Sequence, residues 1–325
     1  MKFMKDIKPY NKYWGNCVVN MFLSIIKDAS YEVMIYLNDY NYCFREEGMF
    51  LDYTKEYYHT IQKDIFSVEK YNFNDSDNFI PELKKLIMSE KYVLVYVDLF
   101  YWIEDGLYYN KVHMPHSSLI TGFNEEEGLF YVLEDDKNSV YEIKEIPQSS
   151  VIEAFNSPYK KPGKDYTLIS FTQKTLPKFK LEKSGIVNST QKLISHLTDL
   201  INDKESRKME AMFTNMQFPY MFAIDCGKVT NRFYGNTVFF SILQEQGFIT
   251  EDYMNELNNK AQSIGYKWSA LKSIIMRDYY NNEFPDMDGI NSILMEVFRD
   301  EKEMWVDFLA QNFIHDSQVS EKIIF

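Results

Sequence analysis

Residues 11–25 read NKYWGNCVVNMFLSI, and the fold expected of this chain depends on how this stretch is divided. Its first part ends in Gly15 and Asn16, a pair typical of loops, and the apolar residues from Val18 onward recur with helical spacing. Cys17 therefore stands at the start of a predicted helix, where the positive end of the helix dipole favours a thiolate over a thiol. Because the thiolate is the nucleophilic form, the sequence predicts covalent chemistry at Cys17.

A predicted hairpin farther along supplies the base that a nucleophilic cysteine needs. Residues 113–123 read HMPHSSLITGF and predict a strand, and residues 129–136 read LFYVLEDD and predict its partner, which ends in acids. The acidic turn between them ends in Gly128. His116 directly precedes the first strand, where rigid backbone can aim its ring, whereas His113 is expected to be a neighbour or a substrate contact.

This chain order resembles that of papain-fold enzymes, in which a cysteine starts a helix, a histidine starts a strand and a carboxylate ends the next strand. More closely, His116 followed by LITGF, an acidic turn and LFYVLED is similar to the N-terminal domain of the butirosin-biosynthesis acyltransferase family. That family in turn resembles the bacteriocin-leader peptidases and the papain-like enzyme that forms amides in closthioamide assembly. The resemblance implies Cys17 as nucleophile, His116 as base and Asp135 as the acid that orients the base. Glu134 and Asp136 stay open as alternatives, because alternation along a strand separates these two from Asp135.

The resemblance also implies an oxyanion hole and suggests weaker binding residues. Papain-like enzymes carry a glutamine six residues before the cysteine, and the corresponding residue here is Asn11, a shorter side-chain amide. His113, Asp98 and Trp14 are weaker candidates for substrate binding, and Asp98 closes an apolar strand where it could meet an amine. No metal site is predicted, because no cysteine or acid stands at a convincing spacing around the two histidines.

The pattern along the chain predicts an α+β protein of two domains. Strands are expected at 92–100, 117–123, 129–134, 139–144 and 167–172, and helices at 78–88 and 147–155. Proline and lysine concentrate at 157–183, and beyond them helices are expected at 191–201, 233–246, 251–279 and 290–310. We therefore expect a papain-like catalytic domain, with its cysteine helix packed on an antiparallel sheet, over residues 1–175, and an all-helical domain over 185–325. The stretches that begin at Asn231 and Tyr266 resemble the helical domain of the same acyltransferase family.

Composition limits the partners. The chain of 325 residues carries a net charge of −13, which disfavours nucleic acid and suits a cationic small substrate such as a polyamine. Three widely spaced cysteines form no disulfide framework, and Cys43 is expected to be a buried structural residue. No secretory segment or apolar run long enough to span a membrane is present, so a cytoplasmic location is expected.

No glycine falls into a phosphate-binding spacing, so the chain shows no means of activating an acid with ATP. An amide-forming enzyme of this kind would need an activated acyl donor, and a phosphopantetheine thioester on an acyl or peptidyl carrier protein is the expected one, with a small amine as acceptor and no cofactor of its own. Lysines between Lys160 and Lys183 could dock the carrier. Three alternatives stay open: a cysteine peptidase, an N-terminal nucleophile hydrolase released by cleavage after Asn16, and a binding protein without chemistry.

Overall fold

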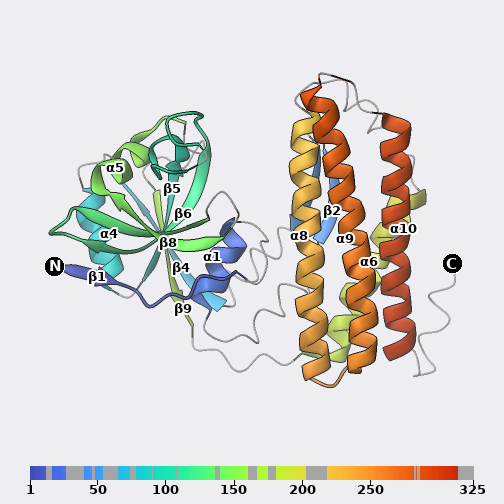
Figure 1. The fold of residues 1–325 in the computed structure, drawn as a ribbon. Coiled ribbons are helices and arrows are strands. Elements are labelled where there is room, and N and C mark those ends of the chain that lie inside the picture. The colour runs from blue at the N-terminus through green and yellow to red at the C-terminus, as the bar shows by residue number, and fades with distance from the viewer. Residues whose placement is uncertain are drawn as a thin grey trace. The chain divides into compact units, whose positions relative to one another are not determined.

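The computed structural model describes residues 1–11, 17–26, 40–45, 48–53, 65–73, 78–89, 91–106, 108–135, 140–159, 167–174, 181–202, 218–281, 283 and 286–313. These residues form an α+β protein, as the sequence predicts (Figure 1). Their contacts divide the chain into two units. The first comprises Met1–Asp28 and His59–Pro177, and the second comprises Ala29–Tyr58 and Lys178–Phe325.

An antiparallel sheet of seven strands forms the centre of the first unit. Six strands follow the order β4-β9-β5-β6-β7-β8, and β1 pairs with β6 outside this path. The strands are β1 (Lys2–Met4), β4 (Phe66–Asn72), β5 (Tyr92–Asp98), β6 (Pro115–Asn124), β7 (Leu129–Asp135), β8 (Tyr141–Pro147) and β9 (Thr167–Gln173). The expected strands are confirmed, with one difference of interest. Strand β5 stops at Asp98, and a short 3-10 turn η3 (Leu99–Tyr101) follows where the apolar run predicted more strand.

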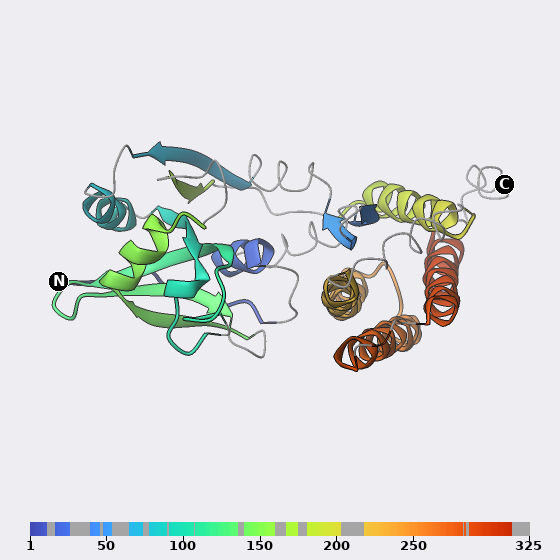
Figure 2. The same ribbon diagram turned by 90° about the horizontal axis from the view of Figure 1, so that it is seen from above.

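Helices cover both faces of this sheet (Figure 2). On one face, α4 (Phe79–Met88) and α5 (Gln148–Asn156) pack on a core that includes Val93, Val97 and Ile120. Toward the other face, α1 (Cys17–Ile25) places Phe22 against Phe66 and Phe171, at ring-centroid distances of 5.1 and 5.2 Å. Buried residues follow one another along the inner strands β5 and β6, so that both faces of the sheet are covered.

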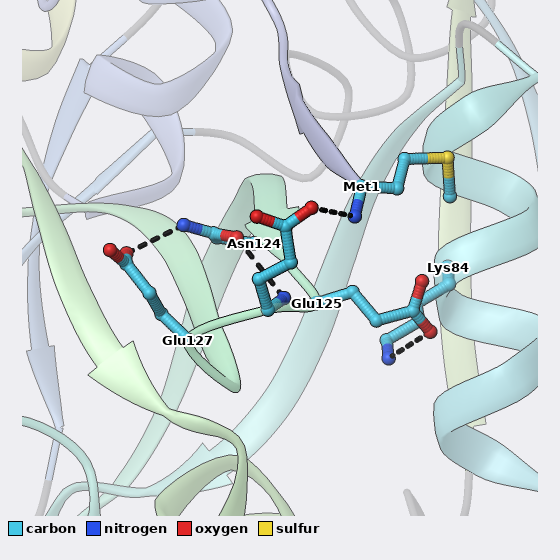
Figure 3. A network of polar contacts seen from close by, with 6 residues as sticks. Met1, Lys84, Asn124, Glu125 and Glu127 are labelled. Carbon is cyan, nitrogen blue, oxygen red and sulfur yellow. Dashed lines mark hydrogen bonds and ion pairs between the residues drawn. The ribbon is translucent and has the colours of Figure 1, made fainter.

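Strand β1 is held by its pairing with β6 and by polar contacts at the β6–β7 turn (Figure 3). The amine of Met1 pairs with Glu126 at 3.0 Å, and Lys84 of α4 pairs with Glu125 at 3.4 Å. A Cβ atom on Gly122 would overlap the carbonyl oxygen of Phe3, so glycine is required where β1 approaches β6.

The second unit consists of four described helices and a hairpin. The helices are α6 (Lys183–Asn202), α8 (Phe218–Glu245), α9 (Glu251–Tyr280) and α10 (Met287–Asn312). Helix α9 packs against both α8 and α10, and α6 packs against α10. The hairpin of β2 (Tyr40–Arg45) and β3 (Gly48–Tyr53) contacts α6 and α8. The second unit therefore contains two strands, whereas an all-helical domain was expected.

Candidate active site

Cys17 is the first residue of α1, as the sequence predicts, and α1 packs against β6 and β7. Its backbone N–H is among the four at a helix start that have no partner within the helix. The side chain of Cys17 lies outside the described residues. Helix α1 therefore fixes the position of this residue in the fold through its backbone.

Tyr10 and Asn11, the last described residues before α1, bond to α1 and to the sheet. The backbone N–H of Tyr10 donates to the Ser24 hydroxyl at 2.9 Å, and Asn20 donates to the Tyr10 carbonyl at 3.3 Å. The side-chain amide of Asn11 bonds the backbone of Tyr141 twice, donating at 2.8 Å and accepting at 2.7 Å. Asn11 thus caps the outer edge of β8, and one of its two amide hydrogens remains for an oxyanion.

His116 is held by a buried carboxylate, and that carboxylate is Glu134. Nε2 of His116 lies 3.1 Å from Glu134 Oε2, and the indole N–H of Trp102 donates to Glu134 Oε1 at 3.0 Å. Glu134 and Trp102 are almost completely buried. The resemblance favoured Asp135 as the acid that orients His116, whereas the carboxylate in contact with His116 is that of Glu134. The cross-strand register of β6 and β7 explains this, because it places residue 134 diagonally opposite His116. The side chain of Asp135 is outside the described residues.

The His116–Glu134 pair lies at the end of the strands. Register and alternation place both residues on the face of the sheet that carries Ile120 and Val132, which α4 and α5 cover. Helix α1 meets the opposite face through Phe22.

A second histidine–carboxylate pair lies beside the first. Asp98 is fully buried and accepts four hydrogen bonds. The backbone N–H groups of Phe100 and Met114 donate to Oδ1 at 3.1 Å each, and Oδ2 lies 2.7 Å from His113 Nδ1 and 2.6 Å from the Ser157 hydroxyl. Burial alone would raise the pKa of Asp98, but the hydrogen bonds from Ser157, His113 and the backbone outweigh it and hold the pKa below its usual value. Asp98 therefore has no exposed oxygen to offer a substrate amine directly, contrary to the role considered from the sequence.

Aromatic rings fix the ring of His113. The centroid of Phe100 lies 4.3 Å away and that of Tyr159 lies 4.1 Å away, each ring tilted by 19° from the imidazole plane. Neither Trp102 nor Ser157 was a sequence candidate. The only sequence signal for Trp102 was an aromatic run directly after Asp98. Ser157 gave no signal, because 59 residues separate it from Asp98.

Other candidates cannot be placed. Trp14, Asp136 and most of the lysines considered for carrier docking (Lys160, Lys161, Lys164, Lys178 and Lys180) lie outside the described residues, as does the side chain of Cys43. Among the residues that are described, no three His, Cys, Asp or Glu side chains gather as a metal site would require.

The two stretches of the helical unit that resemble the acyltransferase family meet at one small hollow. It measures about 110 Å³ and is lined by Thr230, Phe233, Tyr234, Gln262, Gly265 and Tyr266. A Cβ on Gly265 would lie 3.3 Å from the Cβ of Phe233, so this glycine lets α8 and α9 approach closely. Arg232 is buried beside them, which agrees with a structural role.

A comparison with protein-family models and with curated proteins finds no match to this chain. Among the helices within the described ranges, none combines the length and apolarity needed to cross a membrane.

Proposed function

We propose that this chain is a papain-like cysteine acyltransferase that moves an acyl group from a carrier-protein thioester to an amine. One observation carries the proposal: His116 on β6, Glu134 on β7 and Trp102 at the end of η3 form a chain of hydrogen bonds, and the Cys17 helix packs on β6 and β7. The resemblance to the butirosin acyltransferase family supports the choice of thioester and amine as substrates, in biosynthesis of a specialised metabolite.

The tautomer of His116 follows from its partner. Glu134 can only accept a hydrogen bond as a carboxylate, so Nε2 of His116 carries the proton and Nδ1 carries the lone pair. Nδ1 is then the atom that would take the proton of the Cys17 thiol. Trp102 holds the second oxygen of Glu134 and thereby fixes the orientation of the whole pair.

The remaining steps use groups already described. The Cys17 thiolate attacks the thioester carbonyl, and the carrier thiol leaves with the proton that His116 returns. The acyl group stays activated, because a thioester has been exchanged for a thioester, until an amine attacks it. The Cys17 N–H and the remaining amide hydrogen of Asn11 would face the developing oxyanion.

Intact-mass measurement tests the proposal. The full chain is incubated with a panel of acyl N-acetylcysteamine thioesters, and one acyl group should add to Cys17. Cys226 supplies the matched control, because it is a fully buried cysteine in α8. Cys17→Ala should abolish acylation, whereas Cys226→Ala should leave it intact.

The same spectra separate the alternatives. A mass that lacks residues 1–16 would indicate an N-terminal nucleophile hydrolase. An acyl-enzyme that releases only free acid, in the presence of amines, would indicate a hydrolase with the same catalytic residues. Acylation that persists in Cys17→Ala, or a thiol at Cys17 no more reactive than Cys226, would refute the covalent mechanism.

A further inference from the structure

The exposed part of His113 can be located by elimination. Two rings that both stack within 4.3 Å of the imidazole cannot share one face, so Phe100 and Tyr159 cover opposite faces. The edge with Nδ1 faces the buried Asp98 carboxylate. The side chain is nevertheless 33% exposed, so the accessible part is the opposite edge, which carries Nε2.

This nitrogen is a positioned proton acceptor. Asp98 accepts from Nδ1, so the neutral ring carries its proton there and presents the Nε2 lone pair outward. Asp98 is the charged group in contact with the ring, and the other polar neighbours are Ser157, Tyr101 and Tyr159.

The contacts around His113 form a ring that passes through Asp98, Ser157 and Tyr159. Ser157 donates to Asp98 and accepts the backbone N–H of Tyr159 at 3.3 Å, and the ring of Tyr159 then covers the imidazole. Four contacts thus fix one ring whose remaining edge is exposed. A histidine that served only to satisfy Asp98 would need no such clamp on both faces.

Exposed apolar residues adjoin His113. Three of the exposed large hydrophobic residues of the first unit adjoin His113: Val112 and Met114 flank it in sequence, and Tyr159 stacks on it. His113 also lies close to the proposed reaction centre, since three residues of chain span at most roughly 10–11 Å between it and His116. Asp98, which contacts His113, and Val97, which pairs with His116, are adjacent on β5.

We infer that His113 is a second proton acceptor, which deprotonates an amine substrate with an apolar carbon skeleton. This inference rests on the proposed function. The amine arrives as R–NH₃⁺ and gives one proton to Nε2 of His113, which becomes imidazolium beside Asp98. The neutral nitrogen then bonds to the acyl carbon, the carbon–sulfur bond to Cys17 breaks, and the second proton passes to His116. His113 returns its proton to solvent.

The experiment compares amines that differ in whether they need deprotonation. n-Butylamine has a pKa close to the roughly 10.4 of a lysine side chain and arrives charged, whereas hydroxylamine is uncharged at neutral pH. The preformed Cys17 acyl-enzyme is mixed with each, and its decay is followed by quenched intact-mass measurement. The test variant is His113→Asn, which keeps an N–H toward Asp98 and lacks Nε2. His196→Asn makes the same exchange in α6 and serves as the matched control.

His113→Asn should slow the reaction with n-butylamine on the order of 10²-fold, the usual contribution of a general base, and leave the reaction with hydroxylamine almost unchanged. His196→Asn should behave as the unmodified chain does with both amines. An equal loss with both amines would show that His113 only supports the structure, and no loss with n-butylamine would also overturn the inference.

A second readout needs no turnover. In nitrogen-15 histidine spectra of the intact chain, n-butylammonium should shift the Nε2 signal of His113, and a signal that does not move overturns the inference even if the chain proves to form no acyl-enzyme. Failure of Cys17 to acylate refutes the proposed function instead, so the two failures are distinguishable.

Discussion

Exchanging the Glu134 carboxylate for an amide should stop the chemistry while leaving the fold almost unchanged. In Glu134→Gln, the amide oxygen can still accept from the Trp102 indole, which is only a donor, so the amide nitrogen must face His116. That nitrogen donates a proton, and His116 must then switch to the tautomer with its hydrogen on Nδ1. The base would point its lone pair away from the thiol.

The size of the effect follows from this tautomer change. In serine proteases, the same carboxylate-to-amide exchange behind the catalytic histidine lowers kcat by about 10⁴. Both hydrogen bonds of residue 134 survive in the amide, so the free energy of unfolding should fall by less than about 1 kcal/mol. Glu134→Ala is different, because it leaves two buried donors unsatisfied at about 1–3 kcal/mol each, and should cost about 2–6 kcal/mol.

The assay is the rate at which an N-acetylcysteamine thioester acylates Cys17, read by intact mass, together with urea unfolding of each variant. Asp135→Asn is the matched control, since it makes the same change one residue along β7 and should acylate close to the unmodified rate. A fast Glu134→Gln beside an inactive Asp135→Asn would refute the assignment and return the acid's role to Asp135.

Three further predictions concern stability and the oxyanion. The native pKa of Asp98 lies below its ordinary value near 3.9, so the charged carboxylate stabilises the fold above that pH. This contribution disappears as the pH falls through the native pKa. Urea midpoints measured from about pH 5 to pH 2 should therefore depend less on pH in Asp98→Asn than in the unmodified chain. Asn11→Ala should lose about 0.5–1.5 kcal/mol for each of its two bonds to Tyr141, and should slow acylation a further ~10²–10³-fold if its second amide hydrogen serves the oxyanion. A variant that loses stability at an unchanged rate would leave the backbone amide as the donor. Gly122→Ala should detach β1 at a cost of about 1–3 kcal/mol, seen as faster amide hydrogen exchange there, whereas Gly185→Ala, with open space at its Cβ, should be neutral or stabilising.

The sequence predicts those parts of the fold that rest on local periodicity. Each of the following elements was predicted from the pattern of its own segment: the helix start at Cys17, the hairpin of β6 and β7, and helices α9 and α10. Helix α8 begins fifteen residues earlier than predicted, at Phe218 instead of residue 233. It contacts α9 on one side and β3 on another, so it is apolar on more than one face and shows no clear amphipathic pattern.

The parts that were not predicted depend on contacts between distant residues. Trp102 reaches Glu134 across 32 residues, and nothing in the local sequence marks an indole as the donor to a buried acid. Asp98 was expected to close its strand, but the turn η3 after it was not predicted, because the apolar run continues past Asp98. The bond from the Phe100 N–H to the Asp98 carboxylate shows why the chain turns there. The choice among three consecutive acids likewise depends on the register between two strands.

Turn η3 contributes contacts to the surroundings of both histidines. Asp98 caps this turn, Phe100 within it stacks on His113, and Trp102 at its end holds the acid behind His116. One short segment is therefore shared by both pairs, and a shift of the turn is transmitted to each. Thermodynamic reciprocity then applies: if occupancy at His113 changes the affinity at His116, occupancy at His116 must change the affinity at His113 by the same factor. Substitutions at Phe100 and Trp102 should accordingly be non-additive in a double-mutant cycle, although their side chains serve different histidines.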